Sequence, residues 1–157
     1  YGVILVFAEH AEGPQFRYVI RRRDKYRDDV FGEAAFVGWD VDVALDSPAA
    51  RTLQTLRTVA PALSIGRMLT PAELYLAEAE VLFRAALAAQ EPCVLLVAHN
   101  PGLHELAIRC VASSGQNGPL ERKLLSGLPT SGWAAFELSG STLAAPGARL
   151  TAIGLRD

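Results

Sequence analysis

The strongest constraint on the fold is a set of three strand-length apolar segments, each running directly into a polar residue. These segments are "GVILVFA" at 2–8, "VDVALDS" at 41–47 and "CVLLVAH" at 93–99. They are far shorter than the roughly 20 apolar residues that a membrane-spanning helix needs, and they are typical of strands buried on both faces. Because such strands must be covered by helices on both sides, the pattern predicts an α/β fold.

Segments with helical spacing separate the predicted strands. Ser47-Pro48 is expected to open a helix through "AARTLQTLRTVAPAL", and Pro71 a longer one through "PAELYLAEAEVLFRAALAAQ". In the longer segment apolar residues recur every three or four positions, and Thr70 with Glu73 resembles a capping box. The Leu and Ala stripe of this segment is predicted to be core.

The rest of the chain is expected to complete one domain spanning residues 1–157. Asn100 is predicted to cap a third helix whose first position is Pro101. Residues 9–38 are predicted to form a loop and a poorly defined helix, residues 113–132 a loop with a helical turn in "PLERKLL", and "WAAFELS" and "ARLTAIGL" two closing strands. The predicted architecture is a three-layer α/β/α sandwich with a mostly parallel central sheet.

Charge and cysteine content narrow the possible partners. The formal net charge of −2 gives no electrostatic footprint for nucleic acid or an anionic membrane. Cys93 and Cys110 lie in apolar surroundings without metal-like or CxxC spacing, so two reduced core thiols and a cytoplasmic protein are expected. The oligomeric state stays open.

Chemically capable residues follow each predicted strand. In parallel sheets ligands bind outside the carboxyl ends of the strands. This rule marks three places: Glu9 and His10 after the first strand, the span from Asp46 through Ser47 to Arg51 after the second, and His99 with Asn100 after the third. A neutral imidazole can attack phosphorus, and an arginine with a second imidazole can neutralise the equatorial oxygens. Two histidines and an arginine therefore suit phosphoryl transfer, with no metal or cofactor expected.

Other interpretations of these residues compete with the catalytic one. Arg51 could form an ion pair with Asp46, and His10 could be a surface histidine at a strand end. His104 is expected to be a solvated or packing residue. The helix that starts at residues 100–103 is expected to offer further backbone donors to an anion.

Three segments resemble the histidine phosphatase superfamily, and within it the short SixA-like phosphohistidine phosphatases. "SPAARTLQT" at 47–55 is similar to the family's Ser-Pro-x-x-Arg-x-x-Gln-Thr segment. "LLVAHNPGL" at 95–103 is similar to its strand ending in Gly-His-Asn-Pro, with Ala98 for the glycine, and "GLPTSGWAAFEL" at 127–138 to its Pro-Thr-small-Gly turn. The resemblance covers residues 40–138 and implies a phosphoglycerate mutase-like fold.

The resemblance also implies roles for individual residues. His10 would be the nucleophile of a metal-independent phosphatase, and Arg51 and His99 would bind and stabilise the transferring group. Phosphate binding is further assigned to Ser47, Asn100 and Thr130. The implied partner is a phosphorylated protein carrying phosphohistidine, since no long insertion is available to cover a small metabolite.

The N-terminal segment departs from the family. The first strand should end in Arg-His-Gly or Arg-His-Ala, but here Glu9 precedes His10. Three explanations stay open: an incomplete N-terminal record, replacement of the lost arginine by Arg17 or Arg21, or weakened catalysis. The alternative functions are accordingly a small-molecule phosphomonoesterase of the same fold and a catalytically impaired phosphate-binding module. Glu12, Glu73 and Glu105 are candidates for a general acid.

Overall fold

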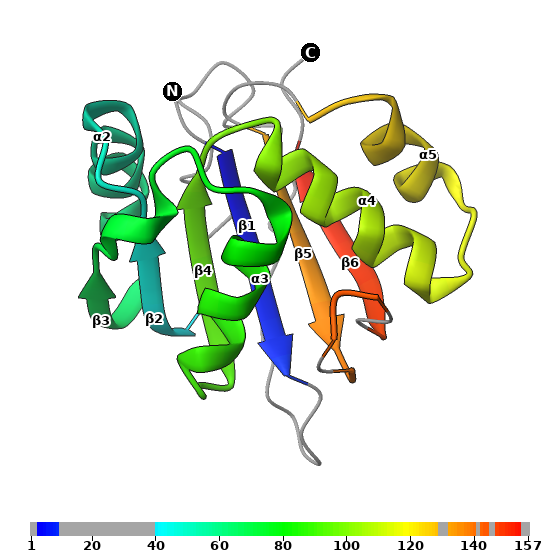
Figure 1. The fold of residues 1–157 in the computed structure, drawn as a ribbon, viewed down its shortest axis with the longest axis horizontal. Helices are drawn as coiled ribbons and strands as arrows, with labels where there is room; N and C mark the ends of the chain where they lie inside the picture. The colour runs from blue at the N-terminus through cyan, green and yellow to red at the C-terminus, as the bar shows by residue number, and fades with distance from the viewer. Residues whose placement is uncertain (1–2, 10–39, 129–131, 141, 145–146, 155–157) are drawn as a thin grey trace.

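A computed structural model describes residues 3–9, 40–128, 132–140, 142–144 and 147–154 of the chain (Figure 1). In residues 3–9 it describes the backbone only. Two of the predicted site residues, His10 and Thr130, lie outside the described residues, as does nearly all of the segment predicted as loop and helix at 9–38.

The core of the fold is one six-stranded sheet in the order β3-β2-β4-β1-β5-β6. The strands are β1 (Val3–Glu9), β2 (Asp40–Asp46), β3 (Ser64–Leu69), β4 (Cys93–Ala98), β5 (Trp133–Leu138) and β6 (Ala148–Gly154). The β2–β3, β2–β4 and β1–β5 pairs are parallel, whereas β1–β4 and β5–β6 are antiparallel. The predicted α/β class with a mostly parallel sheet is confirmed.

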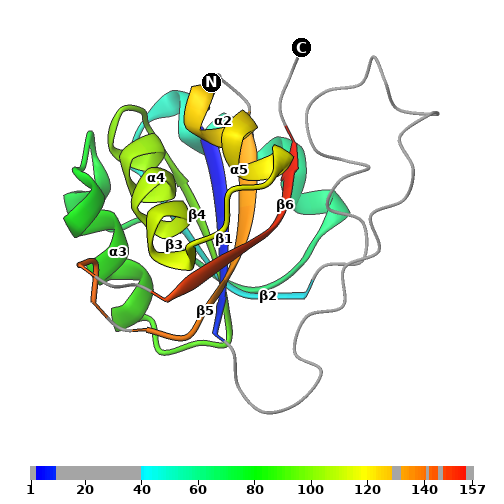
Figure 2. The same ribbon diagram turned by 90° about the vertical axis from the view of Figure 1, so that its right-hand side faces the viewer.

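Helices cover both faces of the sheet (Figure 2). They are α2 (Ala50–Val59), α3 (Ala79–Ala88), α4 (Gly102–Ser114) and α5 (Pro119–Ser126), with short 3-10 turns η2 (Ala60–Ala62) and η3 (Ala72–Leu74). Strand β4 alternates between two apolar clusters, with Cys93, Leu95 and Val97 on the α2 face and Val94, Leu96 and Ala98 on the face of α3, α4 and α5. The three-layer sandwich is therefore confirmed, and no helix among these is long and apolar enough to cross a membrane.

The direction of β1 contradicts one prediction. In the antiparallel register Val3 pairs with Ala98 and Ala8 with Cys93, so Glu9 lies beyond the amino-terminal end of β4. Figure 1 shows β1 and β4 pointing in opposite directions. The expectation that all three buried strands end at the same edge is therefore wrong for the first. An unbroken apolar run specifies burial on both faces but carries no information about strand direction.

The predicted long helix at 71–90 is also wrong in its first half. After β3 the chain forms η3, passes through Leu76 at φ 49°, and begins α3 only at Ala79 with Glu78 as N-cap. No side-chain hydrogen bond caps η3, so the capping box predicted for Thr70 and Glu73 is absent. The fully buried Leu74 continues the apolar stripe, and this hides the break from a periodicity argument.

Several other boundaries differ from the prediction. Strand β3 was not expected because five of its six residues are exposed, and an edge strand of that kind lacks an apolar pattern. Helix α4 begins at Gly102 with Pro101 as N-cap, so Asn100 is not the cap. The helical turn expected in "PLERKLL" is the complete helix α5, and both closing strands are confirmed as β5 and β6.

Both cysteines are buried free thiols, as predicted. Burial raises the pKa of Cys93 to about 12, with a smaller contribution from the carboxylates of Asp42 and Asp40. Burial alone raises the pKa of Cys110 to about 12. Because the thiolate is the reactive form, both side chains act as core residues.

Gly102 permits a close approach between α4 and the segment that precedes α3. A Cβ atom at this position would lie 2.0 Å from the Ala77 carbonyl oxygen and 3.3 Å from the Glu78 Cα. Both contacts are with backbone, so no side chain can move aside to make room. The absence of a side chain at Gly102 therefore fixes the distance between these two segments.

We expect Gly102→Ala to lower the free energy of unfolding by about 1–3 kcal/mol, because the added methyl group overpacks this contact. Urea unfolding of both proteins measures the difference. Gly118→Ala is the matched control, since a Cβ there would meet only the movable carboxylate of Glu121 and the φ of −86° suits any residue. Equal effects of the two substitutions would contradict the steric explanation.

Candidate functional site

The candidate site lies where β2 and β4 end side by side. Asp46 is in register with Val97, and the Ser47 backbone N–H donates to the Val97 carbonyl at 2.9 Å, which extends the pairing one residue beyond β2. Val97 faces α2, and Asp46 opposite it faces the same helix. Two residues after Val97 the chain reaches His99. The parallel pairing thus brings the ends of these two strands to one edge.

Buried polar atoms without hydrogen-bond partners gather at this edge. Among the described residues such atoms are Asp46 Oδ1 and Oδ2, Ser47 Oγ and His99 Nδ1. Asp46 and Ser47 are both 0% exposed. Leaving a buried polar group unsatisfied costs about 1–3 kcal/mol, so native structures keep few of them. These atoms lie on residues at or just beyond the ends of β2 and β4, so this edge of the sheet buries polar groups at a cost in stability.

Asp46 is held in a partly neutral state. Burial raises the pKa of its carboxyl to about 7, although the Thr52 hydroxyl and the positive charge of Arg57 act in the opposite direction. The one hydrogen of the Thr52 hydroxyl is donated to the Ser47 carbonyl at 2.7 Å or the Ala49 carbonyl at 2.9 Å, so the Asp46 oxygens stay without a hydrogen-bond donor and burial dominates. At neutral pH a substantial fraction of Asp46 is therefore protonated and offers an O–H donor, which reduces its repulsion of an anion.

His99 is a neutral imidazole at pH 7. Burial is the main cause that lowers its pKa below the usual 6.5, and nearby positive charge, including that of Arg51, lowers it further. The Tyr75 ring contacts it edge to face, with centroids 6.3 Å apart and planes at 78°. A neutral ring can accept a proton or act as a nucleophile.

The start of α2 supplies positive charge. Arg51 lies in the first turn with its side chain exposed, and the ion pairs of the described residues do not include it. The predicted alternative, a pair with Asp46, is therefore not formed. The N-cap Ala49 makes no side-chain hydrogen bond, and the first turn carries no acidic residue. The first-turn N–H groups and the guanidinium together favour an anion.

The start of α4 is less available than predicted. The Leu103 N–H donates to the His99 carbonyl at 3.1 Å, so it is not a free anion donor. The Asn100 side chain donates through Nδ2 to the Leu128 carbonyl at 2.6 Å, which fixes the loop rather than capping the helix. We therefore assign the backbone N–H groups that could bind an anion at this edge to the first turn of α2 rather than to that of α4.

The structure brings Ser47, Arg51 and His99 to one edge, with Asn100 in the same loop. It does not describe His10 or Thr130, whose roles stay predictions. His104 lies apart, with Nε2 2.9 Å from the Leu124 carbonyl, which fits its predicted packing role.

Sequence reasoning marks Asp46 only as the start of the span 46–51 and as a possible ion-pair partner of Arg51, and it does not select Tyr75. A carboxylate ending a buried strand was a usable signal for Asp46. No comparable signal existed for Tyr75, because periodicity placed its segment in a helix.

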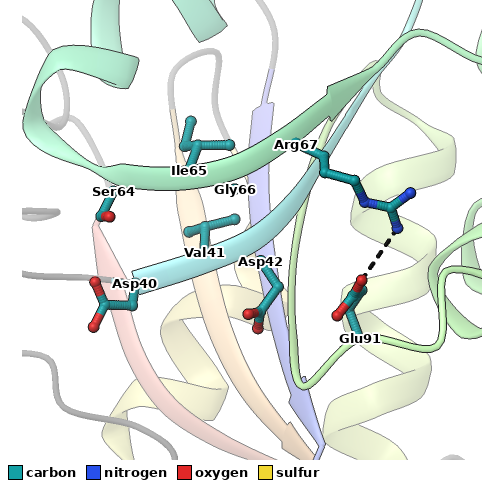
Figure 3. A pocket seen from close by; sticks show the side chains of 8 residues that line it. All are labelled: Asp40, Val41, Asp42, Ser64, Ile65, Gly66, Arg67 and Glu91. Carbon is teal, nitrogen blue, oxygen red and sulfur yellow. Dashed lines mark hydrogen bonds and ion pairs between the residues drawn. The ribbon is translucent and has the colours of Figure 1, made fainter.

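A hollow of about 340 Å³ lies at the opposite edge, near the starts of β2 and β3 (Figure 3). Three of its polar side chains, those of Asp42, Arg67 and Glu91, already have protein partners. Asp42 accepts from the Cys93 N–H at 2.9 Å, and Arg67 forms an ion pair with Glu91 at 3.2 Å. With Asp40 the lining carries three carboxylates and one guanidinium, so it repels phosphate. Within the described ranges no group of three or more His, Cys, Asp or Glu side chains could hold a metal ion.

We expect the raised pKa of Asp46 to make the protein less stable as pH rises. The folded state binds more protons than the unfolded state between the unfolded pKa near 4 and the folded pKa near 7, so the free energy of unfolding falls across this window. Asp46→Asn removes that dependence, and its stability relative to wild type should increase by about 2–3 kcal/mol from pH 5 to pH 8. Urea unfolding at both pH values measures it.

The exposed Asp40 provides the matched control for this experiment. Asp40→Asn should leave the wild-type dependence on pH unchanged. If the unfolding free energy of wild type does not fall from pH 5 to pH 8 relative to that of Asp46→Asn, the prediction is wrong. Asp46 would then ionise as freely in the folded state as in the unfolded one.

Comparison with known proteins shows what this fold is similar to. The sequence matches no protein-family model and no curated protein. A structure from Nakamurella multipartitia, described as a "putative phosphohistidine phosphatase SixA", superposes with a TM-score of 0.63 at 20% identity, covering 99% of this chain and 97% of that one. A protein of the same description from Agrobacterium tumefaciens gives 0.56 at 24% identity, covering 96% and 95%. The chain therefore has the fold of SixA-like proteins over nearly its whole length, as the sequence resemblance predicts.

Proposed function

We propose that this chain is a metal-independent phosphatase that transfers a phosphoryl group at the edge formed by β2 and β4, with protein phosphohistidine as its substrate. The observation that carries the proposal is the group of unpartnered buried polar atoms on Asp46, Ser47 and His99 beside the uncapped start of α2. The SixA description of both similar structures supports phosphohistidine as the first substrate to test.

The proposed chemistry follows from the donors at this edge. The Arg51 guanidinium and the first-turn N–H groups of α2 face the equatorial oxygens of the phosphoryl group, and the Ser47 hydroxyl donates to one of them. A neutral histidine nitrogen forms a bond to phosphorus while the bond to the leaving group breaks. When the ring nitrogen of the substrate that does not carry the phosphate is already protonated, the P–N bond electrons return to the ring and it leaves as neutral imidazole, so it needs little help from a general acid. Water then cleaves the phosphorylated histidine and releases phosphate.

Two histidines are candidates for the nucleophile. The family resemblance assigns this role to His10. The observed direction of β1 places Glu9, the residue before His10, at the edge away from His99. His99 is neutral at pH 7, as a nucleophile must be, and lies near Arg51. The labelling experiment below is designed to distinguish the two.

We expect Arg51→Ala and His99→Ala each to lower kcat/KM at least 100-fold, because each removes a group that stabilises the transferring phosphoryl. Steady-state assays on a phosphohistidine-bearing phosphotransfer protein measure this loss. Arg84→Ala is the control, since Arg84 is an exposed arginine on α3 that pairs only with the exposed Glu80. Full activity in His99→Ala would contradict the site assignment.

Rapid-quench labelling tests the covalent step. Wild type should carry acid-labile phosphate on a histidine during turnover, and loss of the label in His10→Ala would assign the nucleophile to His10, as the family resemblance implies. Label retained in His10→Ala and lost in His99→Ala would move the nucleophile to His99, and turnover without label would exclude a covalent intermediate.

Substrate assays separate the proposed function from its rivals. A higher kcat/KM on sugar or nucleotide phosphates than on the phosphoprotein would favour the small-molecule esterase. Vanadate binding without hydrolysis of any substrate would identify a binding module.

A further inference from the structure

The Tyr75 side chain contacts the candidate site and is at the same time exposed to solvent. Its ring packs edge to face on His99, yet the residue is 57% exposed. The remaining surface of the phenol ring can therefore contact a second group without losing its contact with His99. Because His99 borders the proposed phosphoryl position, such a group would be the part of the substrate that carries the phosphate.

Three other large apolar side chains near this edge are also exposed. Leu76 is 63% exposed, Met68 60% and Leu69 41%. Leu69 is in register with Leu45, one residue before Asp46, so β3 ends at the same edge as the candidate site. Met68 is in register with Ala44 and faces the α2 side of the sheet, whereas Leu69 faces the side of η3. We call Leu69, Tyr75 and Leu76 the apolar rim.

The backbone holds the Tyr75 part of the rim in place. Leu74 before it is fully buried, and the Tyr75 N–H and Ala77 N–H close successive turns onto the Ala72 and Leu74 carbonyls, both at 3.3 Å. Leu76 adopts φ 49°, a left-handed conformation that is rare for a non-glycine residue and that persists only where the surroundings enforce it. This strained turn presents Tyr75 and Leu76 outward together.

The charge around the rim restricts what can bind there. Residues 68–80 contain Glu73, Glu78 and Glu80 but no lysine or arginine. Glu80 has a partner in Arg84, whereas Glu73 and Glu78 are exposed and belong to none of the ion pairs formed by the described residues. A second phosphate or carboxylate on a substrate would be repelled here. A neutral or cationic ring would be attracted to the carboxylates and the phenol face.

We propose that Tyr75 is a specificity-determining residue that packs against a planar, uncharged or cationic ring bearing the phosphate, with the apolar rim completing the contact. This inference rests on the proposed function for the position of the phosphate. It distinguishes phosphate on an imidazole or aryl ring from phosphate on an aliphatic or polyanionic group.

Binding of two non-hydrolysable phosphonates to the full chain tests the contact without requiring turnover. Wild type should bind phenylphosphonate about five- to tenfold more tightly than methylphosphonate by isothermal titration, a range typical of an aromatic contact. Tyr75→Phe should keep this preference. Tyr75→Ala should abolish it while leaving the affinity for methylphosphonate unchanged.

Further variants keep the test decisive. Tyr75→Leu retains apolar bulk but not the planar ring, and should also lose the preference if Tyr75→Ala does not fold. Leu125→Ala removes an exposed leucine on α5, away from the rim, and should bind as wild type does. Equal weakening of both phosphonates in the Tyr75 variants would show that Tyr75 only supports His99, and no preference in wild type would show that no ring contact forms. Either result would overturn the proposal.

Turnover assays then identify the ring and separate the two proposals. Phosphoimidazole and 4-nitrophenyl phosphate should each show a KM about five- to tenfold higher in Tyr75→Ala with little change in kcat, and the larger effect identifies the preferred ring. Glycerol phosphate should show no change. A ring preference in binding without hydrolysis of any substrate would leave the rim assignment standing and reject the phosphatase. Hydrolysis without a ring preference would support the phosphatase and reject the role proposed for Tyr75 and the apolar rim.

Discussion

The parallel pairing of β2 with β4 is the interaction on which the candidate site depends. Strand β4 is buried on both faces, so a one-residue shift in register would move every side chain into the wrong cluster. The resulting fixed register places Asp46 opposite Val97 and leaves Ser47 bonded to the same residue. Helix α2 then starts four residues after Asp46, at Ala50, and this short connection puts Arg51 at the sheet edge.

The site also shows a conflict between stability and ligand binding. Filling this edge with apolar side chains would remove the cost of the unpartnered atoms on Asp46, Ser47 and His99. The buried carboxyl adds an electrostatic cost, because burial disfavours its charged form. A bound anion that accepts hydrogen bonds from the Ser47 hydroxyl and from protonated Asp46 would recover part of the first cost only, and by doing so it would stabilise the folded state.

Much of this arrangement could be predicted from the sequence, for physical reasons that also explain the errors. Apolar runs located β2 and β4, and the polar residues that follow them identified Ser47, Arg51 and His99. The same reasoning did not give the direction of β1, because burial on both faces is compatible with either direction. It also placed Tyr75 in a helix, because the buried Leu74 and Leu82 preserve helical spacing across a break at Leu76. The two buried carboxyl oxygens of Asp46 that lack a hydrogen-bond partner could not be predicted, because their burial depends on tertiary contacts that no local pattern encodes.

The close contact at Gly102 has a mechanical consequence. The Ala77 backbone packs directly on the start of α4 at Gly102. Because Tyr75 lies two residues before Ala77 and His99 three residues before Gly102, this contact restrains the two rings relative to one another. Arg51 is held separately, by α2 on the other face of the sheet. Substitutions of the exposed Tyr75 and Leu76 side chains can therefore leave the spacing between His99 and Arg51 unchanged. In such a molecule substrate preference and reaction chemistry can evolve separately.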